Sequence, residues 1–445
     1  MTVATLPRPL RFLPLRPGWP LTGILLLYPL WWALGLGVLI FPIAAVPMTV
    51  ILIRYRRAGR RIALPPGFVL WLVFLAVVLV SIGALGEDPP GTVAGPASSR
   101  LISVGFRLGE YLSLTALLLY AGNLTEAELP RRRLVKLLGW LFLVTVAGGL
   151  LGVFAGRFEF VSPLELLLPN HIRANGFVQS LVHPAAAQLM DVLGRPTPRP
   201  AAPWGYTNTW GNDFCLLVGW FAVSCAGSRR VRLFGLLVGA VALVPVVYSL
   251  NRGLWIGLGV MAVAVALRMA LRGRFWALAG VAVAATALAG TLAVTPLGTM
   301  VSQRLDHGKS NGVREYLTAK AVDGALDSPV IGYGSTRNTL GGRQSIAVGE
   351  SPDCPRCGNF TIGGNGQLWQ LLYAHGLAGT AGYLAFFGYG LWCFRRDATP
   401  IGLAGGAAVL SSFAAMLWYN SLVTPLAFTM LGYALLWRNA RTVAA

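Results

Sequence analysis

The chain has 445 residues, of which 55% are hydrophobic and 12% are charged, and its formal net charge is +20. A soluble protein carries roughly 25% charged residues, so this composition leaves too little polar surface for a water-soluble fold. Lipid is therefore the expected solvent for much of the chain.

Twelve apolar stretches are long enough to be interpreted as membrane spans, and each should be helical because a helix satisfies its own backbone hydrogen bonds in lipid. They cover residues 20–34, 36–53, 67–85, 101–121, 137–156, 205–225, 233–249, 254–271, 275–297, 377–394, 401–419 and 421–437. The first two favour a tight hairpin, and one long broken segment is the alternative. The predicted fold is an all-α polytopic membrane protein with about 12 transmembrane helices, forming a single membrane domain over residues 1–445.

Basic residues are distributed unevenly between alternate loops. Of the 36 Lys and Arg residues, 22 fall in segments whose loops hold only three acidic residues, Glu126, Glu128 and Asp397. These are the N-terminal segment and residues 54–61, 131–136, 229–232, 268–274, 395–396 and 438–441. Basic loops stay on the cytoplasmic side, so we predict a multi-pass protein of the cytoplasmic membrane with both termini in the cytoplasm. Because this bias accounts for the net charge, nucleic acid is not an expected partner.

Two long loops, residues 157–204 and 298–366, fall on the predicted extracytoplasmic side. Long loops among short ones often carry function. In the second loop, one set of residues at helical spacing runs from Glu315 to Leu326, and a neighbouring apolar set runs from Val313 to Ala325. Pro329 blocks continuation, so the pattern predicts an amphipathic helix along the outer membrane surface.

The same loop contains Cys354 and Cys357 in a C-x-x-C arrangement. Outside the membrane, a short-loop disulfide is favoured, with free thiols or half a zinc site as alternatives. The four histidines lack the spacing of metal ligands, and the chain has no P-loop or dinucleotide fingerprint. No metal and no cofactor is predicted, and ATP-driven transport by this chain alone is disfavoured.

Several arginines fall where a charge is costly unless it has a role. Arg252 lies where two spans meet almost without a loop, and it is interpreted either as an anion clamp or as an anchor that reaches outer headgroups. Arg314 opens the loop helix, with an exposed helix face as the alternative to ligand binding. Arg107 and Glu110 are three residues apart in one span, so a buried ion pair is favoured over a cavity-lining role.

The segment before the sixth span combines arginines, aromatics and amides. Arg173 and Arg199 precede the run PWGYTNTWGND, which contains Asn208 and Asn212. Aromatic residues are common at membrane interfaces, but aromatics beside amides also suit the faces and hydroxyls of sugars. Both interpretations stand.

Four motifs in this order resemble the O-antigen ligase and polymerase family. They are RPAAPWGYTNTWGN, NRGLWIG between two spans, REYLTAKAVDGALDSPVIGYG in the large outer loop, and GNGQLWQLLYAHGLAG entering the next span. The resemblance covers mainly residues 199–380. It implies a GT-C-like glycosyltransferase fold with an active site on the outer face.

The family transfers a glycan from a polyprenyl diphosphate carrier to an acceptor hydroxyl without a nucleotide sugar or a metal. The resemblance therefore implies a lipid-linked glycan donor, a glycan or glycolipid acceptor and membrane lipids as partners. Arg199, Arg252 and Arg314 match the arginines that would hold the diphosphate, and Asn365 matches the asparagine of the last motif. We expect these four residues to converge in one outer-facing cavity. Asn208 and Arg173 are further candidates for substrate binding.

The chain departs from the family pattern where a His-Asn pair is usual, because it has Gly364 before Asn365. In ligases that histidine is thought to act as the base on the acceptor hydroxyl. His307 and Glu315 are the candidate catalytic substitutes, and Asp353 is another. A base would be partly dispensable if the diphosphate leaves readily. Alternative functions are a transporter or flippase of lipid-linked glycans and a non-catalytic scaffold for envelope assembly.

Overall fold

The computed structural model describes residues 16–173, 176–191, 196–294, 298–299, 302, 309–340 and 361–443. The structure is mostly helical, with 70% helix and 4% strand. Within these residues, four helices are long and apolar enough to cross a membrane, namely α5 (Ala97–Asn123), α6 (Arg131–Phe154), α11 (Arg229–Tyr248) and α12 (Arg252–Ala270). On α11, Leu236 and Leu237 are 71% and 64% exposed, which suits contact with lipid. These features indicate an all-α membrane protein.

The structure contains further long helices. They are α3 (Ile40–Arg57), α4 (Phe68–Val80) with a 3-10 turn (Ser81–Ala84), α10 (Thr207–Ser224), α13 (Trp276–Val294), α15 (Lys309–Asp327), α16 (Gln367–Cys393), α17 (Pro400–Ala415) and α18 (Thr424–Val443). The short elements are α1 (Trp19–Leu26), α2 (Tyr28–Ala33), α7 (Pro163–Leu167), α8 (Asn170–Arg173), α9 (Gly176–Val182) and the strands β1 (Ala187–Asp191) and β2 (Pro196–Pro200). The strands form an antiparallel hairpin with Ala187 opposite Pro200.

Eleven of the predicted apolar stretches each coincide with one of these long helices, but the first stretch does not form a continuous helix. It is divided into α1 and α2 at Leu27. Pro29 explains the break, because it has no N–H to donate and its ring would meet the carbonyl group four residues earlier.

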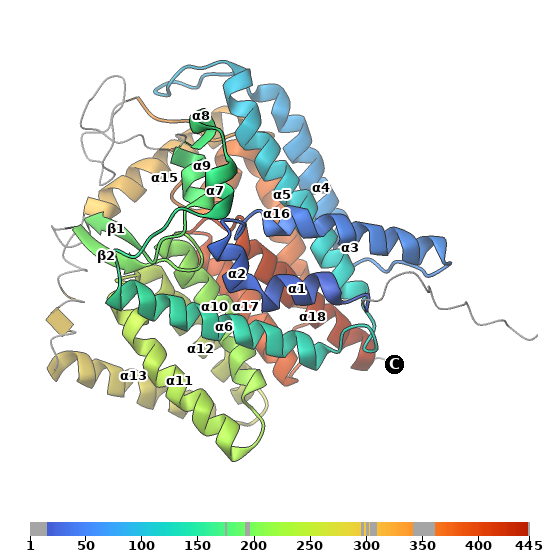
Figure 1. Cartoon of the computed structure of the whole chain (residues 1–445), viewed down its shortest axis with the longest axis vertical. Coiled ribbons are helices and arrows are strands. Elements are labelled where there is room, and N and C mark those ends of the chain that lie inside the picture. The colour runs from blue at the N-terminus through green and yellow to red at the C-terminus, as the bar shows by residue number, and fades with distance from the viewer. Residues whose placement is uncertain are drawn as a thin grey trace, which may run out of the picture.

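The core is built from helices distant in sequence (Figure 1). α10 packs against α6 and α17, α16 packs against α4, and α18 packs against α5. Trp71 of α4 is fully buried, with ring centroids 5.9 Å from Tyr383 and 5.4 Å from Phe386 of α16. Large aromatic side chains such as these dominate the burial of apolar surface. This packing fixes the ends of α5, α16 and α18, which border the cavity described below.

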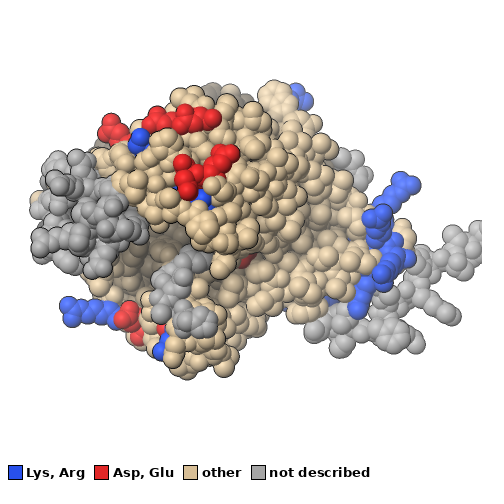
Figure 2. All heavy atoms as spheres, turned by 90° about the horizontal axis from the view of Figure 1, so that it is seen from above, with Lys and Arg blue, Asp and Glu red and all other residues tan. Residues whose placement is uncertain are grey.

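Five of the basic segments that were predicted to be cytoplasmic meet at one end of the molecule. The contacts that join them are Arg60–Glu128 (3.0 Å), Arg438–Glu126 (2.9 Å), Arg131 to Asn439 (2.7 Å), Asn439 to Asp397 (2.7 Å) and Arg272 to the carbonyl oxygen of Arg396 (2.7 Å). Figure 2 shows a group of Lys and Arg side chains along one edge of the molecule, whereas the visible Asp and Glu side chains lie on the other half together with a few Lys and Arg side chains. The charge asymmetry seen in the sequence is therefore also an asymmetry in space.

The predicted loop helix is confirmed as α15, which ends at Asp327 just before Ser328 and Pro329. Its buried face consists of Val313, Leu317 and Ala321, which pack with Tyr333, Ile362 and Tyr373. Val322 and Leu326 on the other face are 38% and 72% exposed. The helix therefore has one apolar face that is covered by the protein, and Val322 and Leu326 are apolar side chains outside that face.

α16 is broken at Gly376, whose φ of 60° lies in the left-handed region. Around this kink, the segment after α15 supplies hydrogen bonds that the helix would otherwise make itself. The N–H of Leu377 donates to the carbonyl oxygen of Pro329 (2.7 Å), and the N–H of Gly334 donates to that of Ala374 (2.8 Å). The tenth predicted span, at 377–394, therefore begins at the kink, and nine further helical residues, 367–375, precede Gly376.

Candidate functional site

A cavity of about 810 Å³ lies where several elements converge. Its wall is formed by the N-terminal parts of four helices, α5, α10, α16 and α18, together with the segment that follows α9 and residues 336–338. The opposite ends of α5, α16 and α18 reach the basic segments already described. The cavity and the basic segments therefore lie at opposite ends of these helices.

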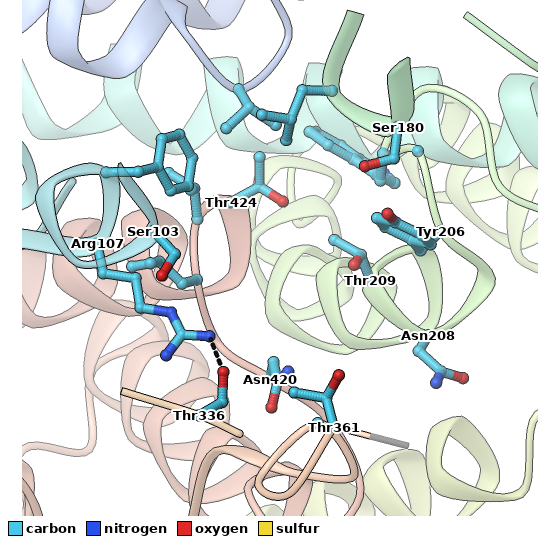
Figure 3. Close-up of a pocket in the computed structure, with 18 of the residues that line it drawn as sticks. Ser103, Arg107, Ser180, Tyr206, Asn208, Thr209, Thr336, Thr361, Asn420 and Thr424 are labelled. Carbon is cyan, nitrogen blue, oxygen red and sulfur yellow. Dashed lines mark hydrogen bonds between the residues drawn. The ribbon is translucent and has the colours of Figure 1, made fainter. Parts of the chain in front are cut away.

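The lining is rich in hydroxyl, amide and guanidinium groups (Figure 3). Arg107 of α5 points into the cavity, and its Nη2 donates to the hydroxyl of Thr336 (3.4 Å). Ser180, Tyr206 and Asn208 lie across from it. Within the described residues, Nη1 of Arg107 is buried and has no hydrogen-bond partner. An unpaired guanidinium N–H beside a polar cavity is a donor ready for an acceptor such as a phosphate or sugar oxygen.

The interpretation of Arg107 and Glu110 as an ion pair is wrong. Both residues are described, and no ion pair joins them. The guanidinium of Arg107 extends toward the cavity, whereas Glu110, 1% exposed, has both carboxylate oxygens buried without a partner among the described residues. A shared helix face permits an i, i+3 contact but does not enforce it when a long side chain has a polar space to reach.

The turn between α11 and α12 is held by Asn251. Its side-chain oxygen caps α12 by accepting the N–H of Leu254 (3.3 Å), and the same oxygen accepts the hydroxyl of Tyr419. Gly253 leaves the room that Tyr419 needs, because a Cβ there would lie 2.3 Å from the tyrosine hydroxyl. Arg252 follows the cap, and its Nη2 donates to Oδ1 of Asn311 (2.7 Å). The NRG sequence thus fixes Arg252 beside α15.

Arg314 and Asn365 hold each other in place. Nη1 of Arg314 donates to the carbonyl oxygens of Trp418 (3.0 Å) and Asn365 (3.4 Å). Nδ2 of Asn365 donates in return to the carbonyl oxygen of Arg314 (3.3 Å) and to the hydroxyl of Thr318 (2.9 Å). Burial lowers the pKa of Arg314, the nearby Tyr419 hydroxyl raises it, and the positive charge of Arg252 lowers it again. Arg252 and Arg314 are therefore close enough to repel each other.

Arg199 connects the β-hairpin to this group. It is buried on β2, and its Nε donates to the carbonyl oxygen of Ser249 (2.6 Å) just before the Asn251 cap. Its Nη1 contacts Sδ of Met190 at 3.2 Å, and Met190 lines the cavity. The charges of Arg199 and Arg314 both act on Tyr419, which also lies in the cavity wall.

The structure thus gathers Arg199, Arg252 and Arg314 around Tyr419, in a shell just behind the cavity wall. Among the described lining residues, the arginines are Arg100, Arg107 and Arg337. The lining residues that belong to the sequence motifs come from the first and the last motif, and they are Pro203, Trp204, Gly205, Tyr206, Asn208, Thr209, Gly364 and Gln370. Arg199, Arg252, Arg314 and Asn365 are all absent from the described lining, so the expectation that these four residues converge within one cavity is wrong. Tyr419, which does line the cavity, feels the charges of Arg199 and Arg314.

The other candidates lie elsewhere. Arg173 is the last residue of α8, and Glu315 is exposed on α15; neither belongs to the described lining. His307, Asp353 and the cysteine pair fall outside the described residues.

Two arginines that the sequence analysis did not select hold the loop beside the cavity. Arg337 donates to carbonyl oxygens that include those of Glu87 (3.1 Å) and Tyr333 (3.1 Å), and Arg100 forms an ion pair with Asp88. Burial and the charge of Arg100 lower the pKa of Arg337. No motif could have revealed this role, because the contacts of Arg337 that tie the two segments together go to backbone oxygens such as that of Glu87, 250 residues away in the chain.

No protein-family model matches the chain, and no curated protein matches its sequence.

Proposed function

We propose that the chain is a glycosyltransferase that moves a glycan from a polyprenyl diphosphate carrier to an acceptor hydroxyl, as an O-antigen ligase or polymerase does. One observation carries the proposal: Arg252 is bound to Asn311, which lies one helical turn before Arg314 on α15, and Arg314 in turn is bound to the carbonyl oxygen of Trp418 in the cavity wall. Holding two like charges together costs free energy, and an anionic ligand offsets that cost. Guanidinium groups bind phosphate oxygens through paired hydrogen bonds.

A diphosphate leaving group suits this arrangement. The acceptor oxygen attacks the anomeric carbon of the donor, and the bond from that carbon to the diphosphate oxygen breaks with its electron pair. Negative charge then grows on the diphosphate, where fixed guanidinium groups stabilise it more strongly than in the ground state. The arginines supply the positive charge that the departing group requires, so the proposed reaction is metal-independent.

The cavity supports the sugar-binding part of the proposal. Its volume of about 810 Å³ is in the range of small-molecule sites, and its wall presents Tyr206, Asn208, Thr336 and Thr361. Hydroxyl and amide groups can donate to and accept from sugar hydroxyls, and an aromatic face can cover the apolar side of a sugar ring.

We place the site on the outer face of the cytoplasmic membrane. With the basic segments in the cytoplasm, twelve helical spans keep both termini there, with α1 and α2 together taking the place of the first span, and the cavity opens at the other side. α15 then lies near the outer surface. Its exposed Val322 and Leu326, with Val330 just beyond the helix, are positioned to meet the boundary of the lipid.

The direct test is turnover by the purified protein in lipid nanodiscs. A polyprenyl diphosphate glycan is supplied with a series of acceptors, and release of the diphosphate carrier is followed together with the linked product. We expect release that depends on an acceptor. Donor binding without release, whatever the acceptor, would contradict the transferase and favour transport of the lipid-linked glycan, which a vesicle translocation assay would then detect.

The topology makes a separate prediction. Reporter tags after Ala58 and Arg132, in basic segments, should be accessible only from the cytoplasm, whereas a tag at Ser345 should be accessible only from outside. A cytoplasmic Ser345 tag would reverse the orientation and remove the outer-face site from the proposal.

A further inference from the structure

His183 lies on the wall of the cavity, one residue beyond the end of α9. Its Nδ1 is 2.8 Å from Oε2 of Glu165, a carboxylate on α7 whose side chain is only 5% exposed. The imidazole itself is 23% exposed. The pair therefore consists of a buried carboxylate and a histidine that reaches the open space.

The backbone around this pair is fixed from both sides. The hydroxyl of Ser162 caps α7 by accepting the N–H of Glu165 (3.1 Å), and it donates to the carbonyl oxygen of Val182 (2.6 Å), the residue before His183. The N–H of Phe160 also donates to the carbonyl oxygen of Pro184 (3.1 Å). These contacts position Glu165 and His183 relative to each other before any ligand arrives.

We propose that His183 is the general base of the transfer reaction and that Glu165 orients it; this inference rests on the proposed function. A carboxylate accepts at such a contact, so Nδ1 of His183 is the donor to Glu165 and Nε2 is the ring nitrogen left for proton transfer in the proposed step. The nearest described carboxylate to Nε2 is that of Glu159, at 3.9 Å, which is too far for a hydrogen bond. Its side chain is 67% exposed, so an entering hydroxyl can take its place.

Nε2 of His183 takes the proton from the acceptor hydroxyl while the hydroxyl oxygen forms a bond to the anomeric carbon of the donor. The bond between that carbon and the diphosphate oxygen breaks, and its electron pair leaves with the diphosphate. The imidazolium, stabilised by Glu165, then returns its proton to water. A carboxylate behind an imidazole is the arrangement that general-base catalysis uses elsewhere.

The cavity leaves few other described groups for this role. Gly364 lines it at the position where the family pattern has its histidine, and it has no side chain to offer. Glu315 is exposed on α15 and is not part of the described lining. His183 approaches from a different loop and supplies an imidazole to the same space.

The test compares His183→Ala and His183→Gln with Glu165→Gln in the turnover assay, with Glu159→Gln as the matched control. We expect both His183 variants to lose about tenfold or more in kcat, with the KM for the lipid-linked donor changed by less than about twofold. Added imidazole should restore part of the kcat of His183→Ala, because the deletion leaves room in the cavity. Glu159→Gln should stay near wild type.

Glu165 is a positioning residue and needs its own readout. Glu165→Gln should lower kcat by less than His183→Ala does, without raising the donor KM. When Glu165→Gln is added to His183→Ala, kcat should fall no further, because Glu165 acts only by orienting the imidazole.

The outcomes separate the two proposals. If wild type releases the carrier and His183→Ala keeps its kcat, the base assignment is wrong and the transferase stands. If wild type releases nothing with any acceptor, both fall. A His183→Gln variant that melts early, together with no imidazole rescue of His183→Ala, would make the pair a structural tie between α7 and α9 and overturn its catalytic role.

Discussion

Replacing Arg252 with lysine is expected to lower turnover of a lipid-linked donor by about ten- to a hundredfold, although the protein should insert and fold normally. The charge is kept, but the planar fork that can bind two phosphate oxygens at once is lost. One charge-assisted contact is worth roughly 1.5–3 kcal/mol, which corresponds to that range of rates. Arg252→Ala should lose more, because it also removes the charge next to Arg314.

The structure supplies a matched control for this substitution at the other end of the molecule. Arg272 also donates through its guanidinium, to the carbonyl oxygen of Arg396 (2.7 Å), but it lies among the basic segments far along the helices from the cavity. Arg272→Lys should therefore have nearly wild-type turnover at matched expression. If Arg252→Lys is equally active, Arg252 is an anchor for headgroups, since lysine reaches them as well, and the diphosphate site loses its main support.

The positions of the helices were predictable because long apolar stretches have few other stable structures in lipid. The first stretch shows where this reasoning fails. Apolar length alone predicted one span at 20–34, but Pro29 divides it into α1 and α2. The nine helical residues before Gly376 were also missed, because they are less apolar than a span and are held by contacts with the loop.

In the candidate site, too, residues in local motifs could be selected from the sequence, whereas contacts between distant segments could not. Arg252 and Arg314 could be selected from sequence because each sits in a compact motif at a predictable place. Arg107 was assigned to Glu110 because sequence spacing reveals neighbours on one helix but not a polar cavity within reach. The pairing of His183 with Glu165 depends on how two loop segments lie against each other, and no spacing rule predicts such a contact.

The kink at Gly376 combines a local and a long-range requirement. Locally, its φ of 60° is a conformation that L-residues with a Cβ adopt only at a cost of roughly 1–2 kcal/mol. At long range, a Cβ on Gly376 would lie 2.6 Å from the carbonyl oxygen of Val330, which belongs to the segment that follows α15. The backbone of that segment donates to and accepts from α16 on both sides of the kink, so it cannot move away without losing hydrogen bonds.

Gly376→Ala is therefore expected to destabilise the protein by about 2–5 kcal/mol, the sum of the unfavourable backbone conformation and the overlap with Val330. Because α15 carries Arg314, a shift of this segment should also lower turnover. The measurement is thermal unfolding of the purified variant in detergent, followed alongside the turnover assay.

Gly388→Ala is the matched control, since it lies in the regular part of the same helix and its new methyl group would meet nothing within 4 Å. That control should unfold at or slightly above the wild-type temperature, because alanine favours helix. Equal unfolding temperatures for Gly376→Ala and Gly388→Ala would show that α16 can straighten without cost and that the kink does not hold the loop in place.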